Sequence, residues 1–430
     1  MFHKFLKYIS QSISGMIGVS VYILADTFFI SYKCGADGLA ALNLILPVFG
    51  LVFAIGSMIG IGSATRYNIS TAQGSPSDYY FTQSIFWCLI CSIPFMLTGI
   101  FIPHKALALL GADAGLIRLG RNYMRIVLLF TPFFMSNYTF TAFARNDHAT
   151  SIAMIGSISG SFFNILFDYI LICIFHMGMQ GAAFATIGGQ FLSALWQLAF
   201  LFGKRTIIPL NATLLKLQLN ISKQIIQTGI PAFLMQISNS VLNIILNASL
   251  VKYGGDLALS AIGIVTSIQT LILMPITGLM QGQQPLISYN YGALKMERVK
   301  ETLKYAIIGA TMIALIGFIA VQFFTKSIVY MFNDEADVVK LCSHALHIWF
   351  MCLPLIGAQV MCANYFQAIG KIKISSVLNL LRQIIILIPC IIIFSSIIGL
   401  DGIFIAVPVA DLSAFIITVL LLKNALKKEA

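Results

Sequence analysis

Charged residues are scarce in this sequence of 430 residues, because Asp, Glu, Lys and Arg together make up only 10% of it. Soluble domains carry about 25% charged residues, so the composition excludes an ordinary soluble protein. The hydrophobic fraction is correspondingly high, at 59%. Transmembrane β-strands would require an alternation of apolar and polar residues over about ten residues, and the apolar runs do not alternate in this way. We therefore expect an all-α polytopic membrane protein.

The sequence also lacks the patterns of common enzymes. It contains no phosphate-binding loop, no hydrolytic triad and no cluster of histidines, and its eight cysteines fall mostly within apolar runs. Cys88 and Cys91 form a C-x-x-C motif without a second pair, for which packed free thiols are a better interpretation than zinc or redox chemistry. We expect neither an enzymatic activity nor a cofactor other than a transported ion.

Apolar segments long enough to cross a hydrocarbon core of ~30 Å as helices recur along the whole chain. Twelve spans are predicted, at residues 9–31, 39–64, 80–103, 122–143, 150–175, 180–202, 225–250, 257–287, 302–325, 341–366, 372–398 and 402–423. The span at 257–287 is unusually long, and we expect its helix to end before the glutamine-rich segment at 281–284.

The formal net charge of +11 is distributed unevenly about these spans. The twelve-span topology places 17 of the 26 Lys and Arg residues on the side of the two termini, eight on the other side and Arg382 within a span. The positive-inside rule therefore predicts that both termini are cytoplasmic. The basic charge orients the chain in the lipid bilayer, and we expect no nucleic-acid partner.

The second half of the sequence repeats features of the first at an offset near 220 residues. GMQGAAFATIGGQ at 178–190 aligns with GLDGIFIAVPVAD at 399–411, and GADGLAAL at 35–42 has a looser counterpart at 254–262. We therefore predict two pseudo-symmetric six-helix bundles, an N-lobe at 1–203 and a C-lobe at 225–430, joined by a cytoplasmic linker at 204–224. Duplicated halves that enclose a site are a transporter architecture.

Polar residues within the predicted spans of the first half share one depth. Counted from the span ends, Asp26, Asp168, Asn164 and Thr186 all fall in the outer third, and Tyr22 lies one helical turn from Asp26. A carboxylate inside a span costs about 2.5–3.5 kcal/mol on insertion scales, and no basic residue of the first half's spans compensates it. A bound cation or proton would compensate the negative charge. The alternative is a carboxyl group that stays protonated and only forms hydrogen bonds between helices.

The order and spacing of several short motifs resemble the multidrug and toxic compound extrusion (MATE) transporters. LADTFFI at 24–30, N-x-x-x-D at 164–168 and GAAFAT at 181–186 are similar to family motifs, and QGQQPLISYNYGA at 281–293, FQAIGK at 366–371 and LLRQ at 380–383 resemble its MepA-like branch. The resemblance implies the MATE fold and an exporter of amphipathic, often cationic, drugs and toxic compounds. It also implies a cation site for H⁺ or Na⁺, with no other metal, at Asp26, Asn164, Asp168 and Thr186, with Tyr22 beside them.

The second half carries neutral amides where the first half carries acids. Gln236, Asn239, Asn243 and Asn247 form a polar stripe on one face of the predicted span at 225–250. This stripe either lines the substrate cavity or forms hydrogen bonds between helices. Arg382 and Asp411 both fall near the middle of the membrane, where they form a structural ion pair or contribute to a substrate or gating path.

These features predict an ion-coupled antiporter of the cell membrane that works by alternating access of its two bundles. A flippase or exporter of lipid-linked oligosaccharide is the alternative, for which we would expect further spans and a strongly basic cavity. The resemblance suggests a monomer whose partners are small amphipathic substrates and the lipid bilayer.

Overall fold

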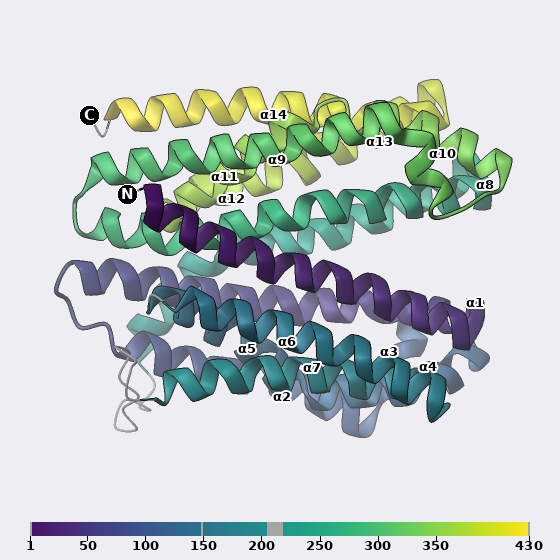
Figure 1. Cartoon of the computed structure of the whole chain (residues 1–430), viewed down its shortest axis with the longest axis horizontal. Coiled ribbons are helices and arrows are strands. Elements are labelled where there is room, and N and C mark those ends of the chain that lie inside the picture. Colours follow the sequence, from purple (N-terminus) through teal and green to yellow (C-terminus); the bar gives the residue numbers. More distant parts are fainter. Residues whose placement is uncertain (1, 148, 204–217, 429–430) are drawn as a thin grey trace.

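The computed structural model describes residues 2–147, 149–203 and 218–428, so most of the predicted linker, 204–217, lies outside the described residues. The chain is built from helices joined by short turns (Figure 1). The first part of the chain forms α1 (Phe2–Ala72), α2 (Tyr79–Phe101), α3 (Pro103–Leu109), α4 (Ala114–Leu129), α5 (Thr131–Asn146), α6 (Thr150–Asp168), the π-helix η1 (Tyr169–Ile174) and α7 (Gly178–Leu201). The second part forms α8 (Leu219–Gly292), α9 (Met296–Tyr330), α10 (Ala336–Trp349), α11 (Leu353–Ala368), α12 (Ile372–Leu380), the π-helix η3 (Leu381–Leu387), α13 (Ile388–Ile398) and α14 (Leu400–Lys428).

Each predicted span overlaps a helix of the structure. Ten helical segments of the described residues are long and apolar enough to cross a membrane, and the number reaches twelve when two bent helix pairs are each counted as one span. The expectation of continuous spans at 122–143 and 341–366 is wrong, because α4 and α5 meet at 48° and α10 and α11 at 53°. Pro132 and Pro354 are the second residue of the second helix in each pair, where a missing backbone N–H does no harm.

The expected end of the eighth span before Gln281 is also wrong, because α8 continues to Gly292. Its glutamines are satisfied inside the protein: the Nε2 of Gln283 donates to the Oδ1 of Asn364 at 3.0 Å, and the Nε2 of Gln284 donates to the Oγ1 of Thr65 at 2.8 Å. Hydropathy alone does not reveal such internal partners, which remove the cost of placing amides in a span.

The repeat appears in the backbone as matched positive φ angles. Gly35 and Gly255, 220 positions apart, have φ of 67° and 62° and reverse the chain within α1 and α8, so that each of these elements holds two spans. Gly178 and Gly399, 221 positions apart, have φ of 54° and 71°. Only glycine adopts such angles without steric cost, which explains why these glycines recur in the two halves.

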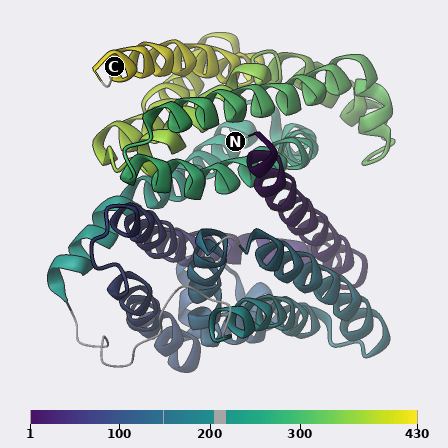
Figure 2. The ribbon, with the colours of Figure 1, turned by 60° about the vertical axis from the view of Figure 1, so that its left-hand side comes forward.

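The helices form two groups, with α2–α7 in the lower part of Figure 1 and α9–α14 in the upper part. The start of α1 lies beside the upper group and then runs toward the lower one (Figures 1 and 2). Accordingly, Phe5 and Ile9 belong to a buried core formed mainly by residues 246–410, whereas Ile30 and Ala41 belong to a core formed by residues 30–225. The two termini lie at one end of the molecule, which we call the terminal end.

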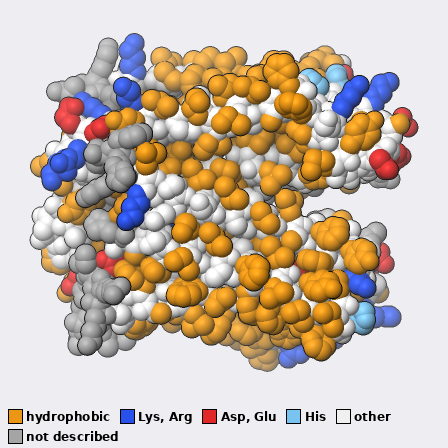
Figure 3. Space-filling model, in the orientation of Figure 1, with side chains coloured by type: hydrophobic (Ala, Val, Ile, Leu, Met, Phe, Trp, Pro, Cys, Tyr) orange, Lys and Arg blue, Asp and Glu red, His pale blue; other side chains and the backbone are white. Residues whose placement is uncertain are grey.

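The two halves approach closely near the terminal end. A Cβ on Gly229 would overlap the carbonyl of Met58, and one on Gly278 would come within 2.8 Å of the backbone of Ile13. Hydrogen bonds join the same region: the Nε of Arg66 donates to the Oγ1 of Thr228 at 2.8 Å, and the Nδ2 of Asn68 donates to the Oγ of Ser288 at 3.0 Å. We call this contact region the seam. At the opposite end the halves are separated by a cleft, which Figure 3 shows together with the hydrophobic surface around the middle of the molecule.

Candidate functional site

The carboxyl groups of Asp26 on α1 and Asp168 on α6 lie within hydrogen-bonding reach of each other. Asp168 is fully buried, and one oxygen of each carboxyl group (Oδ1) is buried without a hydrogen-bond partner. The ion pairs of the described residues lie elsewhere, so no arginine or lysine of this part of the chain compensates the two acids. Two carboxylates in contact repel each other, and a shared proton or a bound cation removes that repulsion.

Asn164 and Thr186 complete this cluster. The Asn164 amide satisfies both neighbours when its nitrogen donates to the Oδ2 of Asp168 at 3.2 Å and its oxygen accepts from the backbone N–H of Thr186 at 3.2 Å. Tyr22 lies one turn from Asp26 on α1 and close to Gln190 of α7. The structure therefore brings together all five residues that the sequence nominates as the cation site.

A π-helical turn begins immediately after Asp168. The π-helix η1 follows α6 without a break, and η3 starts one residue before Arg382 in the corresponding helix of the second half. A π-turn adds a residue to the helical turn, which displaces the side chains on either side and frequently occurs at functional sites. Sequence periodicity does not predict it, because the hydrophobic pattern continues through both segments.

A central cavity of about 290 Å³ lies beside the acidic cluster. Its wall includes Tyr22, Asn164 and Thr186 from the cluster, whereas Asp26 and Asp168 do not line it. The second half contributes residues of α8, namely Gln236, Met274, Gln281, Gln284, Pro285 and Ser288. The wall combines apolar side chains, such as Met16, Phe53 and Met274, with many hydroxyl and amide groups. The volume lies near the lower end of the usual range for small-molecule sites.

Arg145 is the one charged residue among the described residues of the central cavity wall, and it is not predicted as a site residue from the sequence. The predicted span ends at residue 143, which puts the arginine among the basic residues that flank the spans. In the structure α5 carries it into the protein, where it is 8% exposed. The sequence signal that points to this position is the helix-forming run TAFAR at 141–145, which extends the span by another half turn.

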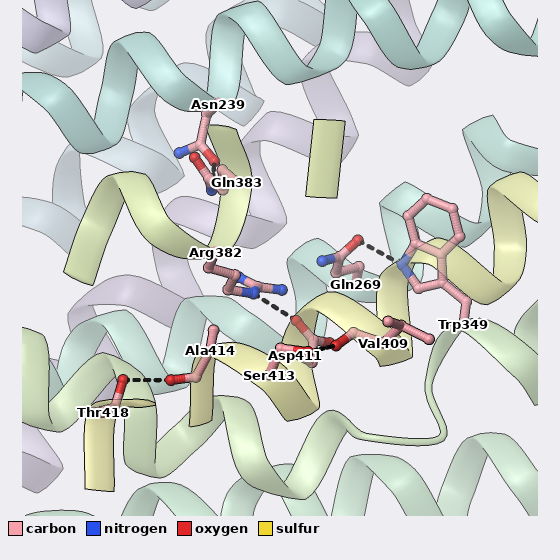
Figure 4. Close-up of polar contacts among 10 residues, drawn as sticks. All are labelled: Asn239, Gln269, Trp349, Arg382, Gln383, Val409, Asp411, Ser413, Ala414 and Thr418. Atoms are coloured by element: carbon pink, nitrogen blue, oxygen red, sulfur yellow. Dashed lines mark hydrogen bonds and ion pairs between the residues drawn. The ribbon is translucent and has the colours of Figure 1, made fainter. Parts of the chain in front are cut away.

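The amide stripe of α8 has three different environments. Gln236 lines the central cavity, and Asn239 accepts a hydrogen bond of 2.5 Å from the Nε2 of Gln383 (Figure 4). Asn243 and Asn247 are exposed and do not line the central cavity. The structure therefore places one member of the predicted stripe at the cavity and one in a contact between helices.

Arg382 and Asp411 meet in the interior of the second half, as Figure 4 shows. The Nε of Arg382 donates to the Oδ1 of Asp411 at 2.6 Å, and their side chains are 14% and 1% exposed. Neither residue lines the central cavity. The second half thus neutralises its buried acid with a base, whereas no Lys or Arg of the described first half forms an ion pair with Asp26 or Asp168.

Duplicated bundles with a polar site and a cavity between them define the class of secondary transporters. The sequence profile of the MatE family matches the chain twice, at residues 12–170 and 231–393, and the chain belongs to this family of multidrug efflux transporters.

Relatives of known function and structure agree with this assignment. The chain is 28% identical over 407 residues to the multidrug export protein MepA of Staphylococcus aureus strain MSSA476, an alignment that covers 93% of this chain and 90% of that protein. The structure of the MATE multidrug transporter DinF-BH, solved in complex with a bound compound, has a TM-score of 0.91 at 29% identity, covering 98% and 95% of the two chains. An outward-facing structure of a multidrug resistance MATE family transporter has a TM-score of 0.92 at 25% identity, covering 98% and 96%.

Proposed function

We propose that this multi-pass membrane transporter is a cation-coupled antiporter of the cell membrane that exports amphipathic organic compounds by alternating access. The observation that carries the proposal is the contact between Asp26 and Asp168, which no base of the described part of the chain compensates. Binding of a positive charge at such a site offsets the unfavourable free energy of burying two carboxylates. The name of one relative and the bound compound of another support small-molecule substrates.

The geometry favours a proton over Na⁺ as the coupling ion. A proton on one carboxyl group allows it to donate to the other, which satisfies an oxygen that otherwise has no partner. Sodium would instead require several oxygen ligands to converge, and the Asn164 oxygen is already engaged by the N–H of Thr186. Both ions would neutralise the acids. The two alternatives therefore differ only in whether a proton gradient or a Na⁺ gradient drives export.

The proposed cycle uses the asymmetry between the two ends of the molecule. With the termini in the cytoplasm, as the positive-inside rule predicts, the cleft faces outward and the seam closes the cytoplasmic side. Ion binding from outside releases the substrate and allows the halves to rock, provided that the two states differ in their affinity for the ion. The inward movement of the ion gains about 2.3 kcal/mol per charge per 100 mV of membrane potential.

The alternative of a lipid-linked oligosaccharide flippase receives less support. A diphosphate headgroup would favour several basic residues around the substrate, and Arg145 is the single basic residue among the described residues of the central cavity wall. A volume of about 290 Å³ suits a small amphiphile better than an oligosaccharide.

Transport in proteoliposomes tests the proposal. We expect the purified protein to export a fluorescent dye when an inward proton gradient is imposed, and to respond weakly to an inward Na⁺ gradient at constant pH. Export driven equally well by Na⁺ alone would identify Na⁺ as the coupling ion, and export that ignores both gradients would contradict antiport.

The Asp168→Asn variant tests the site itself. The amide keeps the size of the side chain but binds no proton, so we expect gradient-driven export to fall by roughly tenfold or more, the scale of one lost charge interaction. Asp37→Asn is the matched control, because Asp37 is an acid of the same half that lies outside the cluster and the central cavity wall. Full ion-driven export by a correctly inserted Asp168→Asn protein would remove Asp168 from the coupling site.

A further inference from the structure

Arg145 is a buried cation without a counter-ion in the described part of the chain. It is 8% exposed, its Nε has no hydrogen-bond partner, and the ion pairs formed between two described residues, His344 with Asp401 and Arg382 with Asp411, do not include it. Asp147, the nearest acid in the sequence, lines neither of the cavities that Arg145 lines. A guanidinium removed from bulk water is costly unless an anion or hydrogen-bond acceptors replace that water.

Arg145 lines two cavities. One is the central cavity, and the other, of about 460 Å³, we call the terminal-side cavity because Lys7 and Arg298 near the terminal end also line it. The two cavities share Arg145, Asn146 and Pro285 as a common wall. A residue that binds substrate in an alternating-access transporter must be reachable from both sides in turn, and Arg145 meets this condition.

The charges of both cavity walls favour an anion. Among the described residues of the terminal-side cavity wall, Lys7, Arg145 and Arg298 are charged and none is acidic, and Arg145 is the sole charged one among the described residues of the central cavity wall. The acids Asp26 and Asp168 are adjacent to the central cavity but do not line it. A cationic group in the central cavity would therefore face a guanidinium across a weakly screening environment, while a carboxylate would pair with it.

We infer that Arg145 binds the anionic group of the exported compound, so that the substrates of this transporter include amphiphiles with a carboxylate, as acids or zwitterions. The inference rests on the proposed export function and specifies its substrate class. The apolar ring system of such a compound would pack against residues such as Met16, Phe53 and Met274 of the cavity wall.

A second explanation assigns Arg145 to the fold alone. It lies in the last turn of α5, where a positive charge interacts favourably with the helix dipole. An exposed side chain would serve that purpose equally well, and burial at the wall of two cavities would not be needed. The two explanations predict different results, because loss of a structural residue affects all substrates alike, whereas loss of an anion-binding residue affects only those that carry the anion.

The test compares a cationic rhodamine ethyl ester with its free acid, a zwitterion of the same ring system. Export in proteoliposomes and equilibrium binding to the detergent-purified protein are measured for both dyes. We expect Arg145→Gln to lower the ratio of acid to ester, in both assays, by roughly 10- to 100-fold, as for the loss of a charge-assisted hydrogen bond. Arg145→Lys should restore part of the ratio, because an ammonium keeps the charge but not the planar fork.

Arg66→Gln is the matched control, because Arg66 is also an arginine near the terminal end but lines neither cavity. Its dye ratio should equal that of the wild type. Equal losses of both dyes in Arg145→Gln, or an unchanged ratio, would overturn the inference. Wild-type protein that binds the ester more tightly than the acid would overturn it too, whatever the folding of the variants. Arg145-dependent binding of the acid without any export would instead disprove the export function, and with it the assignment of exported substrates, while it would confirm that Arg145 binds an anion.

Discussion

Among single residues, the charges inside the membrane-spanning helices show the sharpest difference between the two halves. In the first half, Asp26 and Asp168 contact each other and leave an oxygen each without a partner. In the second half, Asp411 is paired with Arg382 at 2.6 Å. A neutralised pair has no need of an ion, whereas two adjacent acids do, and this difference supports the placement of ion coupling in the first half.

The Arg382–Asp411 pair leads to a prediction about stability. Asp411→Asn leaves the largely buried guanidinium without its counter-ion, and we expect the free energy of unfolding to fall by about 3–5 kcal/mol. Equilibrium unfolding in mixed detergent micelles measures this loss. The double variant Arg382→Met/Asp411→Leu removes both charges and should recover most of the stability. A double variant as unstable as Asp411→Asn would contradict a purely structural pair and would point to a role in the transport path.

The sequence locates some of these residues and not others, for a physical reason. It predicts one shared depth for Asp26, Asn164, Asp168 and Thr186 because a helix has a fixed rise per residue, and the structure places them in one cluster. It does not single out Arg145, because the importance of this residue depends on the two cavities beside it. Cavities form between helices that are distant in sequence, so no local pattern reveals them.

At the scale of helices, glycine and proline decide where the spans bend. The pairs Gly35 with Gly255 and Pro132 with Pro354 occupy corresponding positions in the two halves, at the chain reversals and at the broken spans. These residues are visible in the sequence, but a proline does not by itself indicate a broken span, because proline is common in membrane helices. Which prolines break a helix depends on the packing of the neighbouring helices, and for this reason the sequence predicts the two broken spans as continuous.

The seam depends on glycines that let two helices touch. Gly229→Ala adds a methyl group that would overlap the carbonyl of Met58, so we expect α1 and α8 to separate near the terminal end. The variant should lose export and should expose seam residues to a thiol reagent, measured as faster labelling of a cysteine introduced at Thr228. Gly263→Ala is the matched control on the same helix, because nothing lies within 4 Å of its added Cβ. Unchanged labelling in Gly229→Ala would show that the seam tolerates the methyl group.

For the whole molecule, the functional arrangement is a pair of bundles closed at one end and separated by a cleft at the other. The seam near the terminal end consists of neutral hydrogen bonds and close glycine contacts, together with the bond from Arg66. Such hydrogen bonds are worth about 1 kcal/mol each. A seam of this kind can open and reclose during a transport cycle, whereas a large apolar interface would hold the halves in one state.

A disulfide across the seam tests whether this opening is required. In a background without the eight native cysteines, Asn68→Cys and Ser288→Cys replace side chains that hydrogen-bond at 3.0 Å between the halves. We expect oxidation to stop dye export and a reductant to restore it. The matched control is Gln283→Cys/Asn364→Cys, which replaces a hydrogen bond of the same length within the second half and should leave export active when oxidised. Normal export by the seam-linked protein would contradict alternating access by rocking halves.

The sequence by itself determined the all-helical membrane class, the duplicated halves and the acidic cluster, because hydropathy, repeat spacing and helical rise are local properties of a chain. Only the tertiary structure decided which polar side chains meet, which helices break and where cavities form. Those features depend on contacts between α1, α5 and α8, whose residues lie far apart in the sequence. Asp168 can be recognised from the sequence because it lies within an apolar span. The surroundings of Arg145 are formed by distant parts of the chain, so its position between helices is known only from the folded protein.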